Sequence, residues 1–208
     1  MSDRKPIVYI VDDDISVSRA LTLLLKLHGF RVETFLSAEG FLGFKHPKKP
    51  SCLVLDIQLP DMNGLVLQET MKRKGIIIPI VFITGHGDIS MSVKGIKAGA
   101  TDFLPKPFNR KKLLDSIKQA ILKSKVQIKE QAVLSRINRL LRTLSPRELE
   151  VFRLVAKGML SKQIARKRGI TLQTIKVHRS RVMQKMQAKT VTELIYFAQK
   201  VGVTPFQK

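Results

Sequence analysis

The chain has 208 residues and a formal net charge of +22, with 44% hydrophobic and 26% charged residues. This composition excludes intrinsic disorder, and the length suits two domains of ordinary size. The longest apolar run, Ile76–Ile83, is far shorter than the ~18 residues of a membrane span, and the N-terminus lacks the apolar stretch of a secretory signal. We therefore expect a cytoplasmic protein with no membrane partner. Cys52 is the single cysteine, which excludes an internal disulfide.

Residues 1–123 are predicted to alternate five times between a strand and a helix. The predicted strand and helix ranges are 7–11 and 16–28, 31–35 and 38–44, 52–55 and 65–74, 80–84 and 90–98, and 102–104 and 110–123. Five such alternations predict a parallel, doubly wound α/β sheet. The first, third and fourth strands are almost continuously apolar, as expected where helices cover both faces. In such sheets, functional sites lie beyond the carboxyl ends of the strands.

Polar side chains follow the strands at that edge. Asp12 and Asp13 end the first strand, Asp56 the third and Thr84 the fourth, and Lys106 follows the fifth. Singly, each is a common turn, cap or loop residue. Together, crowded carboxylates favour a bound cation, and Mg²⁺ prefers such oxygen ligands. A lysine beside them can neutralise the oxygens of a phosphoryl group that arrives on the third-strand aspartate.

These residues lie in motifs that resemble the receiver domain of bacterial two-component response regulators. The motifs are Val11-Asp12-Asp13, Leu55-Asp56-Ile57-Gln58-Leu59-Pro60, Asn63-Gly64, Ile83-Thr84-Gly85 and Lys106-Pro107-Phe108. The resemblance implies a flavodoxin-like fold, a histidine kinase as partner, and Asp56 as the phosphoacceptor. By the same resemblance, Mg²⁺ is held by Asp12, Asp13, Asp56 and the backbone carbonyl of Gln58, phosphoryl oxygens are bound by Thr84 and Lys106, and Phe103 is the aromatic switch. Gly85-His86-Gly87 would supply loose backbone for the switching movement.

An enzyme of the haloacid-dehalogenase phosphatase type is the catalytic alternative. Such enzymes also use a strand-end aspartate nucleophile with Mg²⁺, but they place a second acid two residues later. Gln58 occupies that position here. We therefore predict that the protein is not an enzyme.

The second part of the chain is much more basic than the first. Residues 124–208 contain 19 basic and 4 acidic side chains, against 19 and 12 in residues 1–123. Such asymmetry favours a polyanion as partner. Residues 124–143 lack Gly and Pro, which predicts a helical linker. Its apolar seam of Val126, Val133, Ile137, Leu140 and Leu144 fits either pairing of two chains or packing against the chain's own domains.

A helix-turn-helix is predicted after the linker. Ser145-Pro146-Arg147-Glu148 combines an N-cap, an N1 proline and a capping-box glutamate, and a short helix over 161–168 stops at Gly169. A third helix, capped by Thr171, places Ile175, Val182 and Met186 on one side. Its opposite side carries Lys176, Val177, Ser180 and Arg181 and suits a DNA major groove, in which side chains must reach base edges. Arg166, Lys167, Arg179 and Lys185 are available for phosphate contacts. A solvated helix of a protein-binding bundle is the alternative.

Residues 144–203 resemble the LuxR-type DNA-binding domain. The motifs are Leu144-Ser145-Pro146-Arg147-Glu148, Lys162-Gln163-Ile164-Ala165 and Thr174-Ile175-Lys176-Val177-His178. The predicted order is therefore a receiver (1–123), a helical linker (124–143) and a LuxR-type all-α domain (144–208), which resembles the NarL/FixJ family of transcriptional regulators. The resemblance implies promoter DNA as ligand, a homodimer on activation through a last helix that starts near Thr190, and RNA polymerase as a further candidate partner. An adaptor whose C-terminal module binds protein or RNA is the competing hypothesis.

Overall fold

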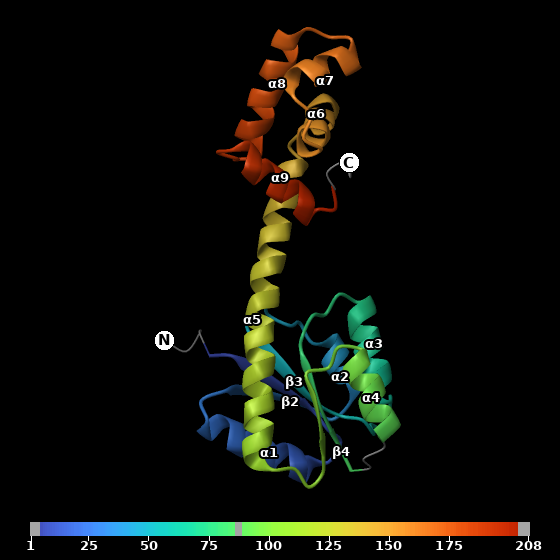
Figure 1. Cartoon of the computed structure of the whole chain (residues 1–208). Helices are drawn as coiled ribbons and strands as arrows, with labels where there is room; N and C mark the ends of the chain where they lie inside the picture. Colours follow the sequence, from blue (N-terminus) through green and yellow to red (C-terminus); the bar gives the residue numbers. More distant parts are fainter. Residues whose placement is uncertain (1–4, 86–88, 204–208) are drawn as a thin grey trace. The chain divides into compact units, whose positions relative to one another are not determined.

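The computed structural model describes residues 5–85 and 89–203. The chain divides into two compact units, Met1–Lys129 and Glu130–Lys208 (Figure 1). Within the described residues, no helix is both long enough and apolar enough to cross a bilayer.

The first unit is built on five parallel strands in the order β2-β1-β3-β4-β5. The strands are β1 (Ile7–Val11), β2 (Arg31–Phe35), β3 (Ser51–Asp56), β4 (Ile80–Thr84) and β5 (Asp102–Pro105). They alternate with α1 (Ile15–Leu27), α2 (Ala38–Gly43), α3 (Gly64–Arg73), α4 (Ile89–Lys97) and α5 (Arg110–Leu141). This confirms the predicted doubly wound, flavodoxin-like sheet.

Helices cover both faces of this sheet, as Figure 1 shows, with α1 and α5 on one face and α2, α3 and α4 on the other. Successive side chains of a strand point to opposite faces. Val8 and Ile10 of β1 therefore pack with α1 and α5, whereas Tyr9 and Val11 pack with α2 and α3. All five residues of β1 are buried, which explains the unbroken apolar run.

The second unit is helical. Its helices are α6 (Pro146–Ala156), α7 (Ser161–Arg168), α8 (Leu172–Lys185) and α9 (Val191–Lys200). The predicted capping box at the start of α6 is confirmed: the Glu148 amide donates to Ser145 Oγ at 3.3 Å, and the Ser145 amide donates to Glu148 Oε2 at 2.8 Å. Gly169 adopts φ +64°, a left-handed conformation that suits glycine at the turn between α7 and α8.

Residues 124–141, which lie in the region predicted as a helical linker, are helical and belong to α5. Helix α5 continues without a break through the predicted boundary at residues 123/124, because nothing in this stretch interrupts a helix. The predicted apolar seam divides in two along it. Ile137 and Leu140 are buried in the core of the second unit, whereas Val126 and Val133 are 56% and 38% exposed.

Candidate phosphoacceptor site and nucleic-acid interface

Three carboxylates meet at the carboxyl ends of β1 and β3. One oxygen from each of Asp12, Asp13 and Asp56 lies within 4.8 Å of the other two. Asp12 and Asp56 are buried, and Asp13 is exposed. A set of carboxylate oxygens open to solvent on one side suits a hard divalent cation that keeps some of its water, so these residues fit Mg²⁺.

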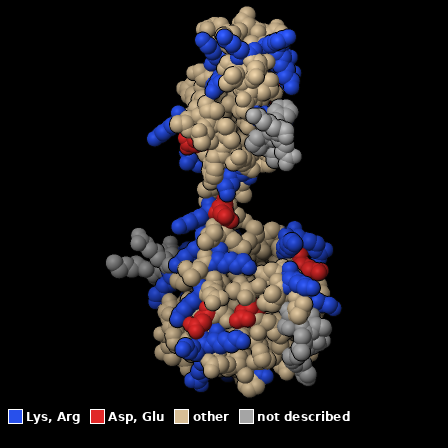
Figure 2. All heavy atoms as spheres, viewed as in Figure 1, with Lys and Arg blue, Asp and Glu red and all other residues tan. Residues whose placement is uncertain are grey.

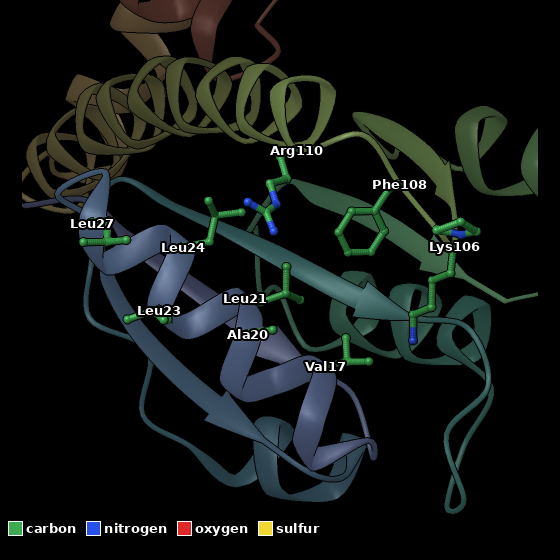
Figure 3. Close-up of a pocket in the computed structure, with 10 residues that line it drawn as sticks. Val17, Ala20, Leu21, Leu23, Leu24, Leu27, Lys106, Phe108 and Arg110 are labelled. Atoms are coloured by element: carbon green, nitrogen blue, oxygen red, sulfur yellow. The ribbon is translucent and has the colours of Figure 1, made fainter.

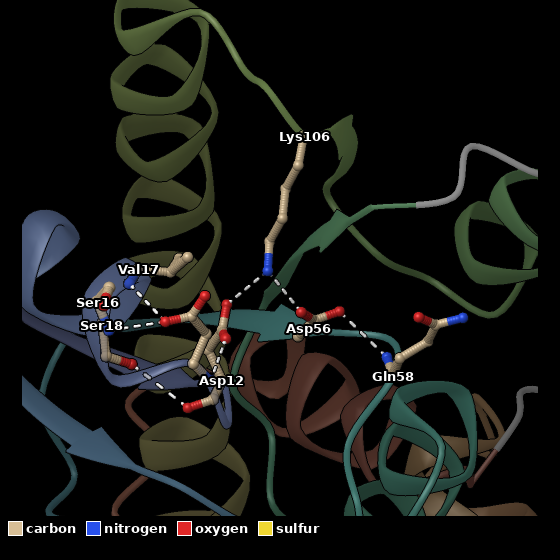
Figure 4. A network of polar contacts seen from close by, with 8 residues as sticks. Asp12, Ser16, Val17, Ser18, Asp56, Gln58 and Lys106 are labelled. Carbon is tan, nitrogen blue, oxygen red and sulfur yellow. Dashed lines mark hydrogen bonds and ion pairs between the residues drawn. The ribbon is translucent and has the colours of Figure 1, made fainter.

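Lys106 connects two of these carboxylates. Its Nζ donates to Asp12 Oδ2 at 2.8 Å and to Asp56 Oδ2 at 2.6 Å, as the dashed lines in Figure 4 show. Burial alone would lower the pKa of Lys106, but these two hydrogen bonds hold the pKa above its ordinary value. The lysine therefore stays charged and offsets part of the negative charge of the site.

Neighbouring backbone groups orient both buried carboxylates. The Asp14 amide donates to Asp12 Oδ1 at 2.9 Å. The Gln58 amide donates to Asp56 Oδ1 at 3.1 Å, as Figure 4 shows. Burial raises the pKa of Asp12, and the hydrogen bond from Lys106 opposes this rise. Each carboxylate is thus fixed through both of its oxygens.

Gly64 permits a close approach of α3 to the end of β3. A Cβ atom added to Gly64 would lie 2.6 Å from the carbonyl oxygen of Asp56 and 3.0 Å from the Cα of Ile57. The Gly64 amide donates to the Ile57 carbonyl at 2.8 Å, which holds the two segments together. We did not assign Gly64 a role from the sequence; the Asn63-Gly64 pair before a helix was the available signal.

The predicted switch residues lie on the two strands beside the site. Thr84 ends β4 and is buried, and its carbonyl accepts the Lys106 amide at 2.6 Å. Phe103 of β5 is half-buried, with its ring centroid 6.0 Å from that of Phe82. Of the predicted flexible stretch after Thr84, His86 and Gly87 lie outside the described residues.

An apolar hollow of about 490 Å³ adjoins the site. Figure 3 shows its walls, which come from one side of α1 and from the segment between β5 and α5. Lys106 lines this hollow and also contacts Asp56. Leu23 and Leu27 of α1 are 65% and 76% exposed beside it. A partner that fills the hollow would therefore lie next to the carboxylates.

The predicted two-sided character of α8 is confirmed. Ile175, Val182 and Met186 are fully buried in the core of the second unit. The four predicted base-contacting side chains are all exposed: Lys176, Val177, Ser180 and Arg181. This helix therefore presents a free face of long donors and small side chains, which a major groove accommodates.

The four predicted phosphate contacts differ in their surroundings. Arg166 and Lys167 are exposed at the end of α7, and Figure 2 shows lysines and arginines gathered over one end of the second unit. Arg179 is half-buried and donates to Ser161 Oγ at 3.1 Å, which links α8 to α7.

Lys185 has an internal partner that we did not anticipate. Its Nζ donates to Glu148 Oε2 at 2.6 Å and to the Thr143 carbonyl at 3.2 Å. Since Glu148 is a buried carboxylate, Lys185 serves mainly to neutralise it. We therefore leave Lys185 out of the proposed DNA contacts. The sequence separation of 37 residues hid this pair from analysis of the sequence.

Two family profiles match the chain. The profile "Response regulator receiver domain" matches residues 8–118, and "Bacterial regulatory proteins, luxR family" matches residues 142–198. "Transcriptional regulatory protein FixJ" from Bradyrhizobium diazoefficiens is 37% identical over 196 residues, which cover 94% of this chain and 96% of that protein. The chain belongs to the NarL/FixJ family of response regulators.

Other members of the NarL/FixJ family are similar over nearly the whole chain. "Nodulation protein W" from Bradyrhizobium diazoefficiens is 43% identical over 200 residues, 96% of this chain and 88% of that protein. The solved structure of "Response Regulator StyR" is 43% identical with a TM-score of 0.79, covering 94% of this chain and 99% of that one. The receiver and the LuxR-type DNA-binding domain of the family are thus both present, and the DNA-binding hypothesis is favoured over the adaptor.

Proposed function

We propose that Asp56 accepts a phosphoryl group from a histidine kinase and that this event controls promoter binding through α8 in the cytoplasm. The observation that carries the proposal is Lys106, whose Nζ joins Asp12 and Asp56 beside a third carboxylate. Such a lysine is poorly explained as a structural residue, but it is suited to phosphoryl oxygens.

In the proposed reaction, a carboxylate oxygen of Asp56 forms a bond to phosphorus while the bond from phosphorus to the kinase histidine breaks. The histidine nitrogen leaves with the bonding electron pair and takes up a proton. Lys106 turns its ammonium toward the incoming oxygens, and the Thr84 hydroxyl donates a hydrogen bond to them. Phe103, which pairs with Phe82 on the strand that ends in Thr84, changes its packing in response.

Asp12, Asp13, Asp56 and the backbone carbonyl of Gln58 would hold Mg²⁺. When bound, the ion supplies positive charge that neutralises the phosphoryl oxygens. The product is an acyl phosphate on the protein itself, so the protein acts as a phosphorylated switch with no turnover of an external substrate. Activation is proposed to yield a homodimer that binds paired half-sites, with RNA polymerase as a further partner.

The phosphoacceptor is tested by intact mass. Incubation with acetyl phosphate and Mg²⁺ should add one phosphate to the protein, and Asp56→Asn should lose this addition. Asp61→Asn, at an exposed carboxylate that caps α2, is the matched control and should keep it. A phosphate that persists in Asp56→Asn overturns the assignment.

DNA recognition by α8 is tested by paired substitutions. Lys176→Ala should weaken binding to a specific duplex by about 1–3 kcal/mol and weaken binding to a scrambled duplex less. Arg166→Ala, at the end of α7, should weaken both duplexes similarly. If Lys176→Ala weakened binding to both duplexes equally, this result would contradict a base contact by Lys176 and would favour the adaptor hypothesis.

A further inference from the structure

The end of the first unit opposite Asp56 is strongly basic. Segments 45–51, 72–80, 94–101 and 123–129 meet there and contain 11 Lys and Arg residues and no Asp or Glu. Hydrogen bonds join these segments: the Ser51 amide donates to Ser124 Oγ at 3.0 Å, and Lys123 Nζ donates to the Gly99 carbonyl at 3.1 Å. We name these four segments the basal surface.

Five aspartates lie at the opposite edge of the same sheet. Asp12, Asp13, Asp14, Asp56 and Asp61 follow the carboxyl ends of β1 and β3. The base of the first unit therefore carries cations without carboxylates, whereas the phosphoacceptor edge carries carboxylates together with cations such as Lys106. The modest net charge of the first unit conceals a surface that attracts anions strongly.

Helix dipoles explain part of the basal charge. Cations are favourable at helix C-termini, and segments 72–74 and 94–97 lie at the ends of α3 and α4. Lys45 and Lys48 lie instead in the loop before β3, and Lys125 and Lys129 lie in the middle of α5. All four are exposed, and within the described part of the chain none of them forms a salt bridge.

The basal surface also has a concave part. A cavity of about 370 Å³ lies between the segment before β4 and α5, with Lys72 and Lys123 in its walls. Lysines on the two sides of a hollow are suited to a chain of phosphates that passes between them.

Chain connectivity keeps this surface near DNA. Leu144, the start of the predicted DNA-binding domain, lies fifteen positions after Lys129, and this stretch spans at most ~50 Å even when fully extended. Duplex DNA carries one negative charge for about every 1.7 Å of its axis. When α8 occupies its site, the basal surface therefore meets a high effective concentration of phosphates on the same duplex.

We propose that the basal surface of the receiver binds phosphates of the duplex that flanks the site contacted by α8. This binding is independent of base sequence and adds affinity and salt dependence to the specific contacts of the second unit. This proposal rests on the proposed binding of DNA by α8. It adds a DNA contact in the first unit, which contains the proposed phosphoacceptor.

The test compares two duplexes that share one site selected by the full-length protein. The short duplex has about 20 base pairs, enough for two half-sites, and the long duplex carries about 20 further base pairs on each side, which exceeds the reach of the tether. Dissociation constants are measured against salt concentration after treatment with acetyl phosphate. Lys48→Gln/Lys125→Gln removes two basal charges, and Arg19→Gln/Lys111→Gln removes two exposed charges near the opposite edge as the matched control.

The unaltered protein should bind the long duplex more tightly and with a steeper salt dependence than the short one. The basal variant should lose about five-fold in affinity per phosphate contact near physiological salt, and its salt slope should fall by about 0.9 per contact, on the long duplex only. The control variant should match the unaltered protein on both duplexes. Exposed lysine-to-glutamine changes leave folding nearly unaffected, which thermal melting verifies.

Two results would overturn the basal contact: equal affinity of the unaltered protein for both duplexes, or equal losses in the basal and control variants. Failure of the proposed function is separately visible, because the short duplex would then bind no better than a scrambled short duplex. Loss of affinity on the short duplex in the basal variant would also reject the flanking contact.

Discussion

Gly64 lies where the backbones of β3 and α3 approach too closely for a side chain. In Gly64→Ala, the new Cβ would meet the Asp56 carbonyl oxygen at 2.6 Å, so this backbone must move. Small displacements of reacting groups slow a reaction strongly. We therefore expect the rate of phosphorylation by acetyl phosphate to fall about tenfold or more. Gly43→Ala is the control, since nothing lies within 4 Å of its Cβ position. An unchanged rate in Gly64→Ala would show that the approach does not position Asp56.

Glu148 makes the second unit sensitive to acid. The hydrogen bond from Lys185, followed by that from the Ser145 amide, holds the pKa of Glu148 at about 2, below its ordinary 4.5. A carboxyl group with a lowered pKa in the folded state stabilises the fold above its unfolded pKa. We therefore expect the stability of the second unit to fall as the pH decreases from about 4.5 toward about 2.

Glu148→Gln should remove this component of the pH dependence and should destabilise the second unit by about 1–2 kcal/mol at neutral pH, through loss of the cap and the ion pair. Hydrogen exchange of the α6 amides at several pH values measures both effects. Glu130→Gln, at an exposed position of α5, should leave the profile unchanged. If the pH dependence of exchange in Glu148→Gln matches that of the unaltered protein, Glu148 is not the group that makes the second unit sensitive to acid.

At the scale of elements, α1 and Lys106 line the same apolar hollow, and we propose that a kinase docks there to reach Asp56. Leu23→Asp alters an exposed side chain beside the apolar hollow and leaves the carboxylates intact. We expect phosphotransfer from the partner kinase to slow about tenfold, as for loss of an interface anchor, while the rate with acetyl phosphate stays the same. Ile77→Asp, an exposed apolar residue outside this hollow, should leave both rates unchanged. Equal slowing with both donors would place the defect at Asp56 and not in docking.

The elements themselves were largely predictable, because continuous apolar strands and helical spacing depend on local sequence. The strand-end residues Asp12, Asp56 and Lys106 followed from the topology, since parallel strands end at one edge. Three features did not follow. The unbroken α5 did not follow because the boundary between the two units falls inside this helix without a residue that ends it. The Glu148 to Lys185 pair joins distant segments, and the tight approach at Gly64 exists only after folding.

At the scale of the whole molecule, the two units have separate cores. The core of the second unit contains residues from Ile137 onward, and both cores of the first unit end by Ile121. The intervening part of α5 contains the exposed Val126 and Val133 and contributes little buried area. We therefore expect two calorimetric transitions on heating, one for each unit.

Mg²⁺ should shift only one of these transitions. A ligand stabilises only the unit whose folded state binds it, by RT ln(1 + [L]/Kd), which amounts to about 2.7 kcal/mol at one hundred times Kd. The proposed ligands all belong to the first unit, so Mg²⁺ should raise the melting temperature of that unit alone, and EDTA should reverse the shift. Asp13→Asn, at the exposed carboxylate of the cluster, should reduce the shift, whereas Asp115→Asn on the exposed side of α5 should not. Because the second unit is the internal reference within each scan, a shift of both transitions by Mg²⁺ would point to a general ionic effect and would contradict a site at Asp12, Asp13 and Asp56.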